Sequence, residues 1–137
     1  MKILALPLLV AVAFSGNTLA EKKPKISVKA NPTMGMSPVR VVVTADITGG
    51  ANDDADFYCA AVEWEWGDDT RSTNNADCDP YEAGKSEFKR RFTADHTYRT
   101  SGEYRVMFRL KKKDKVIGAG NTSVKVRGGL GDDDRDR

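Results

Sequence analysis

The segment 62–66, near the middle of the chain, constrains the fold more than any other stretch. Its apolar residues Val62, Trp64 and Trp66 occupy every second position, and glutamates stand between them. A period of two is typical of a strand with one face in a core and the other in water. Two tryptophans on one face can seed that core, because each ring buries a large apolar area. The Gly-Asp-Asp that follows at 67–69 predicts a turn.

The same alternation recurs along the chain, and no stretch shows a helical period. Strands are predicted around 26–30, 39–47, 57–66, 88–92, 104–110 and 122–126. The segment 67–86 has no apolar rhythm and is expected to be a long polar loop. Six or seven short strands joined by polar turns predict an all-β fold, an antiparallel β-sandwich.

The N-terminal residues 1–20 are expected to be a secretory signal peptide. Lys2 precedes an apolar run over 3–14, and Thr18-Leu19-Ala20 is a small-residue cleavage site. The protein would then be secreted or periplasmic, without a transmembrane segment after removal of the signal. An uncleaved membrane anchor is the alternative interpretation, but the apolar run is short for a spanning helix.

The chain has 137 residues, which allows one domain of ordinary size, expected over 26–127. Residues 128–137 are rich in glycine and aspartate and are expected to be a disordered acidic tail. The formal net charge is only +2, whereas phosphate binding needs a concentrated positive field. We therefore expect no nucleic-acid partner. Basic clusters at 89–91 and 111–115 are expected to protect sheet edges from aggregation.

The two cysteines, Cys59 and Cys78, predict a disulfide in an exported chain. With a single histidine, the chain lacks the nitrogen ligands that would complete a structural zinc site around one cysteine pair. The bond would attach the long polar loop to the strand that carries the tryptophans. Tyr81, an aromatic residue in this loop, is the candidate ligand contact, because binding residues concentrate on loops held by a rigid scaffold. The alternative is that Tyr81 packs the loop onto the sandwich.

Three separated motifs together resemble the PKD (polycystic kidney disease-type) domain, an immunoglobulin-like module. The segment 64–69, Trp-Glu-Trp-Gly-Asp-Asp, is similar to the family's W-D-F-G-D-G. His-Thr-Tyr at 96–98 resembles its H-T-Y, and 102–106 resembles its G-x-Y-x-V. The resemblance covers about 26–126. The motif residues to which it assigns a structural role are Trp64, Trp66, Gly67, Asp68, His96, Tyr98, Gly102 and Tyr104.

The resemblance implies a PKD-like sandwich that contacts an extracellular or envelope protein or a glycan, by analogy of fold alone. Tyr98 suits a corner tyrosine whose hydroxyl bonds to nearby backbone, and Gly102 suits a tight turn with positive φ. Asp68 can bond the turn backbone two residues on. The chain departs from the family pattern at Asp69, which replaces a turn glycine, and in the length of 70–95.

Few residues have the pattern of an active site, so no enzyme activity and no cofactor are predicted. His96 beside an aspartate could suggest a nucleophile triad, but a histidine that supports the turn is the favoured interpretation. Glu63 and Glu65 share one face of a strand, whereas glycosidase carboxyls converge from opposite sides of a bond. They are expected to pair with Arg105 or Arg109 on a neighbouring strand.

A calcium-stabilised structural module of the cell envelope is the alternative function. Asp53, Asp54 and Asp56 in one loop supply hard oxygen ligands, the type that calcium prefers. Further carboxylates stand in the second loop at Asp68, Asp69, Asp77 and Asp79. The pattern lacks the glycine and the terminal glutamate of an EF-hand, and solvated loops are the simpler interpretation.

Overall fold

The computed structural model describes residues 23–129. The predicted signal peptide therefore lies outside the described residues, and so does the predicted tail beyond Gly129. Within the described range no helix is long and apolar enough to cross a membrane.

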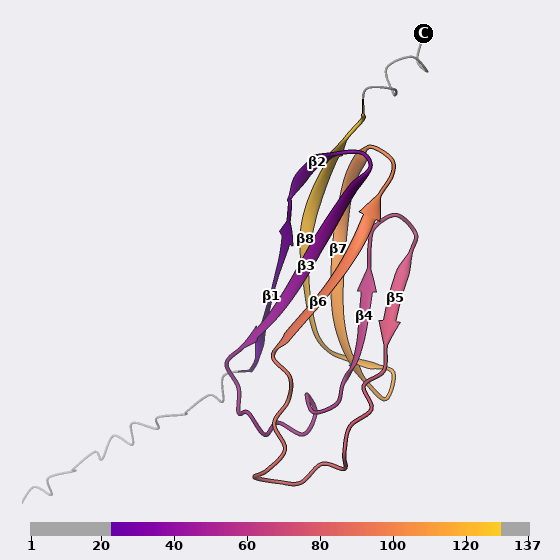
Figure 1. Cartoon of the computed structure of the whole chain (residues 1–137). Helices are drawn as coiled ribbons and strands as arrows, with labels where there is room; N and C mark the ends of the chain where they lie inside the picture. The colour runs from indigo at the N-terminus through magenta and orange to yellow at the C-terminus, as the bar shows by residue number, and fades with distance from the viewer. Residues whose placement is uncertain (1–22, 130–137) are drawn as a thin grey trace, which may run out of the picture.

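The described residues form eight strands in two facing sheets, as Figure 1 shows. The strands are β1 Lys25–Asn31, β2 Met34–Met36, β3 Val39–Thr48, β4 Ala61–Glu65, β5 Arg71–Asn74, β6 Arg91–Tyr98, β7 Gly102–Lys112 and β8 Lys115–Arg127. The smaller sheet has the order β1-β3-β6, and the larger has the order β2-β8-β7-β4-β5. This two-layer arrangement confirms the predicted all-β sandwich.

One pair of strands departs from the predicted antiparallel arrangement. The chain leaves the smaller sheet after β1, crosses to the larger sheet, and forms β2 parallel to the end of β8. Backbone hydrogen bonds from Lys125 N to Thr33 O and from Ser37 N to Arg127 O hold this crossing, at 2.9 and 2.8 Å. The two sheets are thus joined along the β1 flank.

Alternation alone placed the boundaries of three strands wrongly, and one of them is β6, which spans Arg91–Tyr98 rather than 88–92. β4 begins at Ala61 rather than at Phe57, because the chain turns through Cys59 with φ of 56°. β8 begins well before 122, since Gly118 and Gly120 interrupt the apolar pattern. A Cβ at Gly118 would lie 2.7 Å from the Ile26 side chain, so glycine allows β1 to pack closely on β8.

The core consists of the inward side chains of both sheets. The buried residues of the central strands are Val41, Val43, Ala45, Ile47, Val62, Trp64, Val106, Phe108, Leu110, Val124 and Val126, joined by Trp66 just after β4. Trp64 packs on Phe108, with ring centroids 4.7 Å apart, and Phe92 of the facing sheet packs on the same ring at 5.5 Å. The two tryptophans that were expected to seed the core are therefore buried in it, whereas the motif residue Tyr104 is only half-buried.

Truncation of Trp64 tests this core. Trp64→Ala should lower the free energy of unfolding by about 3–5 kcal/mol, because it removes a large buried ring between the sheets. Val42→Ala on the outer face of β3 is the control and should change stability by less than about 0.5 kcal/mol. Urea unfolding followed by fluorescence of Trp66 measures both variants, and equal small losses would contradict the core assignment.

Candidate functional site

The turn after β4 has a backbone shape that few residues allow. Gly67 has φ of +83°, and a Cβ there would lie 2.7 Å from the carbonyl oxygen of Arg105. Asp69 also has positive φ, at 66°, a conformation that aspartate tolerates better than most residues. Asp68 Oδ1 accepts hydrogen bonds from the backbone N–H of Thr70, at 3.1 Å, and from the Thr70 hydroxyl. The expected bond from Asp68 to backbone two residues on is thus present.

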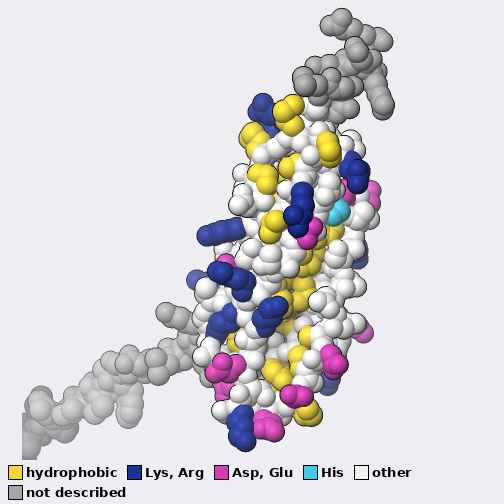
Figure 2. Space-filling view, viewed as in Figure 1, with side chains coloured by type: hydrophobic (Ala, Val, Ile, Leu, Met, Phe, Trp, Pro, Cys, Tyr) yellow, Lys and Arg dark blue, Asp and Glu magenta, His cyan; other side chains and the backbone are white. Residues whose placement is uncertain are grey.

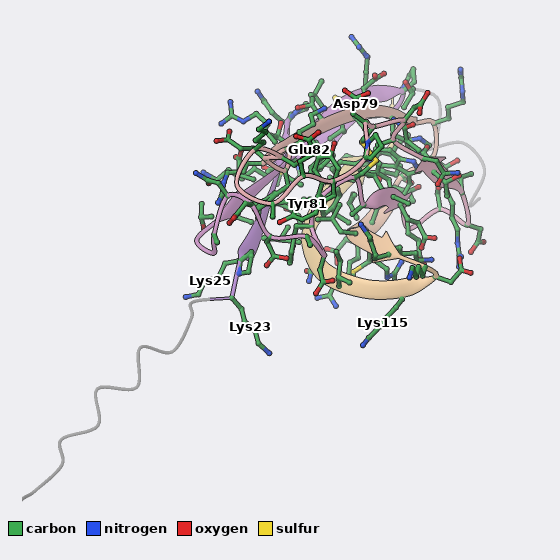
Figure 3. The ribbon with its side chains drawn as sticks, turned by 90° about the horizontal axis from the view of Figure 1, so that it is seen from below. Lys23, Lys25, Asp79, Tyr81, Glu82 and Lys115 are labelled. Carbon is green, nitrogen blue, oxygen red and sulfur yellow. A yellow bond between two sulfur atoms is a disulfide. The ribbon has the colours of Figure 1, made fainter. Side chains whose placement is uncertain are left out.

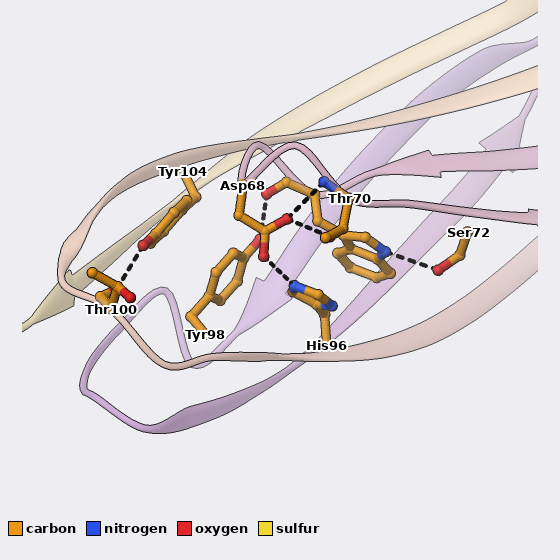
Figure 4. A network of polar contacts seen from close by, with 8 residues as sticks. Asp68, Thr70, Ser72, His96, Tyr98, Thr100 and Tyr104 are labelled. Atoms are coloured by element: carbon orange, nitrogen blue, oxygen red, sulfur yellow. Dashed lines mark hydrogen bonds and ion pairs between the residues drawn. The ribbon is translucent and has the colours of Figure 1, made fainter.

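His96 of β6 connects this turn to the opposite sheet (Figure 4). Its Nε2 lies 2.6 Å from Asp68 Oδ2, and its ring stacks on Trp66 with centroids 4.7 Å apart. The Tyr98 hydroxyl donates to the carbonyl oxygen of Trp66 at 2.6 Å. The turn of one sheet is therefore bonded to the last strand of the other, and we call Trp66, Asp68, His96 and Tyr98 the upper joint.

Two expectations about the tyrosines and Gly102 were wrong. Tyr98 bonds to distant backbone, whereas the local bond is made by Tyr104, whose hydroxyl donates to Thr100 O at 2.6 Å. Gly102 does not have positive φ. A Cβ at Gly102 would lie 3.3 Å from the Tyr104 ring, so glycine makes room for that ring rather than for a turn.

Burial and hydrogen bonding together shift the pKa values of Asp68 and Tyr98 in the upper joint. Burial opposes ionisation of Asp68, but the hydrogen bonds from Thr70 and His96 outweigh it and lower the pKa of Asp68. Burial, with the nearby charge of Asp68, raises the pKa of Tyr98, so its hydroxyl remains a donor. Thr70 donates to the aspartate and not to His96, which is not the arrangement of a nucleophile triad.

The paired glutamates lie on the outer face of the larger sheet, as predicted. Arg109 Nη1 lies 2.7 Å from Glu65 Oε2 and 3.2 Å from Glu63 Oε1. Lys111 was expected to protect a sheet edge, but it lies on β7, inside the larger sheet, and bonds Glu63 at 2.6 Å. Its hydrogen bond to Glu63 lowers the pKa of that carboxyl, which burial would otherwise raise. Arg105 pairs with neither glutamate, because it lies opposite Ser123, beyond the end of β4.

The long connections at the lower end of the sandwich are held by a disulfide and by two tyrosines. We call residues 49–60 and 75–90 the loop end. Cys59 and Cys78 are bonded, with Cα atoms 6.0 Å apart. The Tyr58 hydroxyl donates to Asp79 O at 2.7 Å, and Tyr81 donates to Asp53 O at 2.6 Å. The two tyrosine rings pack together at 5.5 Å.

Arg90 holds the first loop of this end from within the second. Its guanidinium donates to Asn52 Oδ1 at 2.7 Å and to the carbonyl oxygen of Gly49 at 2.9 Å. The same group lies 4.4 Å from the centroid of the Phe88 ring. Arg90 was expected to protect a sheet edge as part of a basic cluster, but its guanidinium instead bonds the loop 49–52.

Tyr81 is part of the packing and part of the surface, with 38% of its area exposed. Figure 3 looks onto the loop end, where Asp79, Tyr81 and Glu82 lie together and apart from Lys115. Asp53, Asp54 and Asp56 do not converge, since Asp54 Oδ1 instead accepts the backbone N–H of Asp56 at 2.9 Å. Over residues 23–129, no group of three or more His, Cys, Asp or Glu is placed to hold a metal ion.

Comparison with known proteins shows the fold. No family model and no curated protein matches the chain. Among solved structures, the PKD domain of an M14-like peptidase from Thermoplasmatales archaeon SCGC AB-540-F20 is similar, with 19% identity and a TM-score of 0.51. The match covers 78% of this chain and 98% of that one. The chain thus has a PKD-like, immunoglobulin-like fold.

Two further solved structures are similar to the chain only with TM-scores below 0.5. The CARDB domain of PF1109 from Pyrococcus furiosus has 12% identity and a TM-score of 0.46, over 76% of this chain and 94% of that one. A superoxide reductase (neelaredoxin) from Ignicoccus hospitalis has 14% identity and a TM-score of 0.47, over 82% of this chain and 88% of that one.

Reduction of the disulfide tests how the loop end is held. Loss of the bond should lower the free energy of unfolding by about 3 kcal/mol. The cross-link closes a loop of this size in the unfolded chain and so reduces the conformational entropy of that chain. Hydrogen exchange should rise in 75–86 and leave β3 and β7 protected. The Cys59→Ser/Cys78→Ser variant should behave like the reduced protein. Unchanged exchange in 75–86 would show that the tyrosines and Arg90 suffice without the disulfide.

Proposed function

We propose that this protein is a secreted or periplasmic, non-catalytic binding module that contacts an extracellular or envelope protein or a glycan through its loop end. The observation that carries the proposal is the way the loop end is built. In 75–90 the chain forms no strand, yet a disulfide, the Tyr58–Tyr81 pair and Arg90 fix it in one arrangement. A preorganised surface loses little conformational entropy when it binds.

The residue types at the loop end support contact with a macromolecule. Tyr81 presents an aromatic ring with a polar tip, a combination enriched at interfaces. Asp79 and Glu82 lie on the same side of this end and are exposed, as is Asp53, whose carbonyl oxygen Tyr81 contacts, and charges at a rim steer association and select partners. The PKD-like fold is compatible with such a module but does not by itself specify a function.

The contacts of the chain's single histidine support a non-catalytic role. His96 is occupied by Trp66 and Asp68, and no described hydroxyl bonds to its ring. The paired glutamates are likewise occupied by Arg109 and Lys111. An extracellular address is supported by the apolar run at 3–14 and by the disulfide, which persists in oxidising compartments.

Site-specific photo-crosslinking tests this function in the native host. A photoreactive phenylalanine analogue is placed at Tyr81 or Glu82, and at Lys115 as an exposed control on the other side of the same end. We expect a discrete protein or glycan adduct at 81 and 82 but not at 115. Tyr81→Ala should then weaken binding of the captured partner about tenfold, while Tyr81→Phe retains it. Equal labelling at all three positions would refute the proposed surface.

A further inference from the structure

The two sheets cover each other unequally, and one flank of the sandwich stays open. The smaller sheet has three strands and ends at β6. The larger sheet has five and extends past β7 through β4 to β5. The Trp66 indole donates to Ser72 Oγ at 2.9 Å, which places Ser72 on the inner side of β5, yet Ser72 and Asn74 are exposed. Phe92 and Ala94 on the inner side of β6 are only half-buried. The core is therefore incompletely covered beside β6.

We call this opening the β6 groove, bounded by the edge of β6 and the inner faces of β4 and β5. In Figure 2 an apolar strip runs down the middle of the molecule, with the histidine near its upper end. The upper joint closes the groove above, where His96 bonds Asp68. Below, the start of β6 adjoins a pocket that Cys59 and Cys78 line together with Phe92.

The backbone along this groove has unused hydrogen-bonding groups. Among residues 23–129, β6 pairs with β3 alone. Ile47 N donates to Arg90 O at 2.8 Å, and alternation from that pair directs the bonds of even-numbered β6 residues toward β3. The N–H and C=O groups of Thr93, Asp95 and Thr97 therefore point into the groove. At eight residues, β6 is the longest of the edge strands described.

The lower part of the groove contains an apolar pocket of about 170 Å³. Its walls are Phe57, Phe88, Phe92, Ala60, Ala76 and the disulfide, and its rim carries Glu87 and Lys89. Lys89 Nζ lies 5.1 Å from the centroid of the Phe92 ring. Within the described residues neither Lys89 nor Glu87 forms an ion pair, so the lining carries one charge of each sign, and the positive one lies beside the Phe92 ring.

The charges on β6 do not obstruct the groove. Arg91 bonds Asp46 at 2.7 Å, and Arg40 bonds Asp95 at 3.1 Å. Both pairs lie on the outer face of the smaller sheet, where the odd-numbered side chains of β6 point to solvent. Proline and bulges, which commonly protect sheet edges, are absent from β6, and the basic cluster 89–91 that was expected to protect an edge reaches only its first residue.

The overhang of the larger sheet decides what can occupy the groove. A second copy that added its own β6 here would bring its own larger sheet into the space already taken by β4 and β5. One extended segment needs only the width of a strand, about 4.8 Å. The side chains that border this space are the half-buried Phe92 and Ala94 of β6 and the exposed, polar Ser72 and Asn74 of β5. These constraints favour a single strand from an otherwise unfolded region.

We propose that the β6 groove binds an extended peptide segment of a partner protein, which becomes the fourth strand of the smaller sheet. Main-chain bonds to Thr93, Asp95 and Thr97 would hold it, and an apolar side chain next to an acidic residue would enter the pocket beside Lys89. The inference rests on the proposed binding function, but it assigns a different surface and the class of partner.

Peptides selected from a random decapeptide library on the full chain are the probe. Thr93→Pro removes an N–H that faces the groove without removing a bond to β3, and Ala76→Trp fills the pocket. Each should weaken the selected peptides at least tenfold. The matched control is Ala30→Pro, on the free edge of β1, which should bind as the unaltered chain does. Lys89→Glu should weaken the binding of peptides that carry an acidic residue after the anchor.

N-methylation of the peptide keeps the test independent of variant folding. Methyl groups on alternate backbone nitrogens should abolish binding, and those on the intervening nitrogens should be tolerated. The proposal is overturned if no peptide is selected, if methylation shows no alternation, or if Thr93→Pro has no effect. It is also overturned if sedimentation shows a dimer that Thr93→Pro dissociates. Crosslinking at Tyr81 without peptide binding would reject this inference and leave the proposed function intact.

Discussion

The stack of His96 on Trp66, with its bond to Asp68, is the contact on which the arrangement of the two sheets depends. Hydrophobic packing holds the sheets together but is non-directional, so it does not by itself fix one strand against a turn. The upper joint supplies that direction. Asp68 is positioned by Gly67, whose missing side chain lets the turn approach the backbone of Arg105. The Tyr98 hydroxyl then donates to the carbonyl oxygen of Trp66. This buried backbone acceptor is thereby satisfied.

The rest of the molecule is organised by where such connections occur. On one flank the chain crosses from β1 to β2 and joins the sheets covalently. On the other, the upper joint bonds the two sheets at the top, and the disulfide bonds the β3–β4 connection to the β5–β6 connection at the bottom. Between these two points Phe92 and Ala94 of β6 are only half-buried, and Ser72 of β5 is exposed. The open flank is therefore a consequence of the same connections that stabilise the fold, and both proposed surfaces lie at or beside it.

Much of this fold could be predicted from the sequence because the core strands alternate. The apolar residues of β3, β4 and β7 each recur with a period of two, and these residues are the buried ones. β5 could not be predicted in this way, since Arg71–Asn74 contains no apolar residue and is exposed throughout. The partner of Glu63 was found only in part, because strand register decides which basic side chain lies opposite, and Lys111 was as plausible by charge as Arg105.

The loop end and the groove were harder to predict for a different reason. The sequence identified the cysteine pair and Tyr81, but the carbonyl groups that Tyr58, Tyr81 and Arg90 contact have no signature in residue types. The groove depends on a difference in strand number between the sheets, which no local pattern encodes.

The pH dependence of stability tests the upper joint most directly. The lowered pKa of Asp68 means that its ionised form stabilises the folded state at pH values above about 4, the ordinary pKa of aspartate. This contribution is lost as pH falls through the lowered pKa. The unaltered protein should therefore be more stable than Asp68→Asn at pH 6, by urea unfolding, and the difference should vanish by about pH 2. A difference that is absent at pH 6, or constant from pH 6 to 2, would contradict the account.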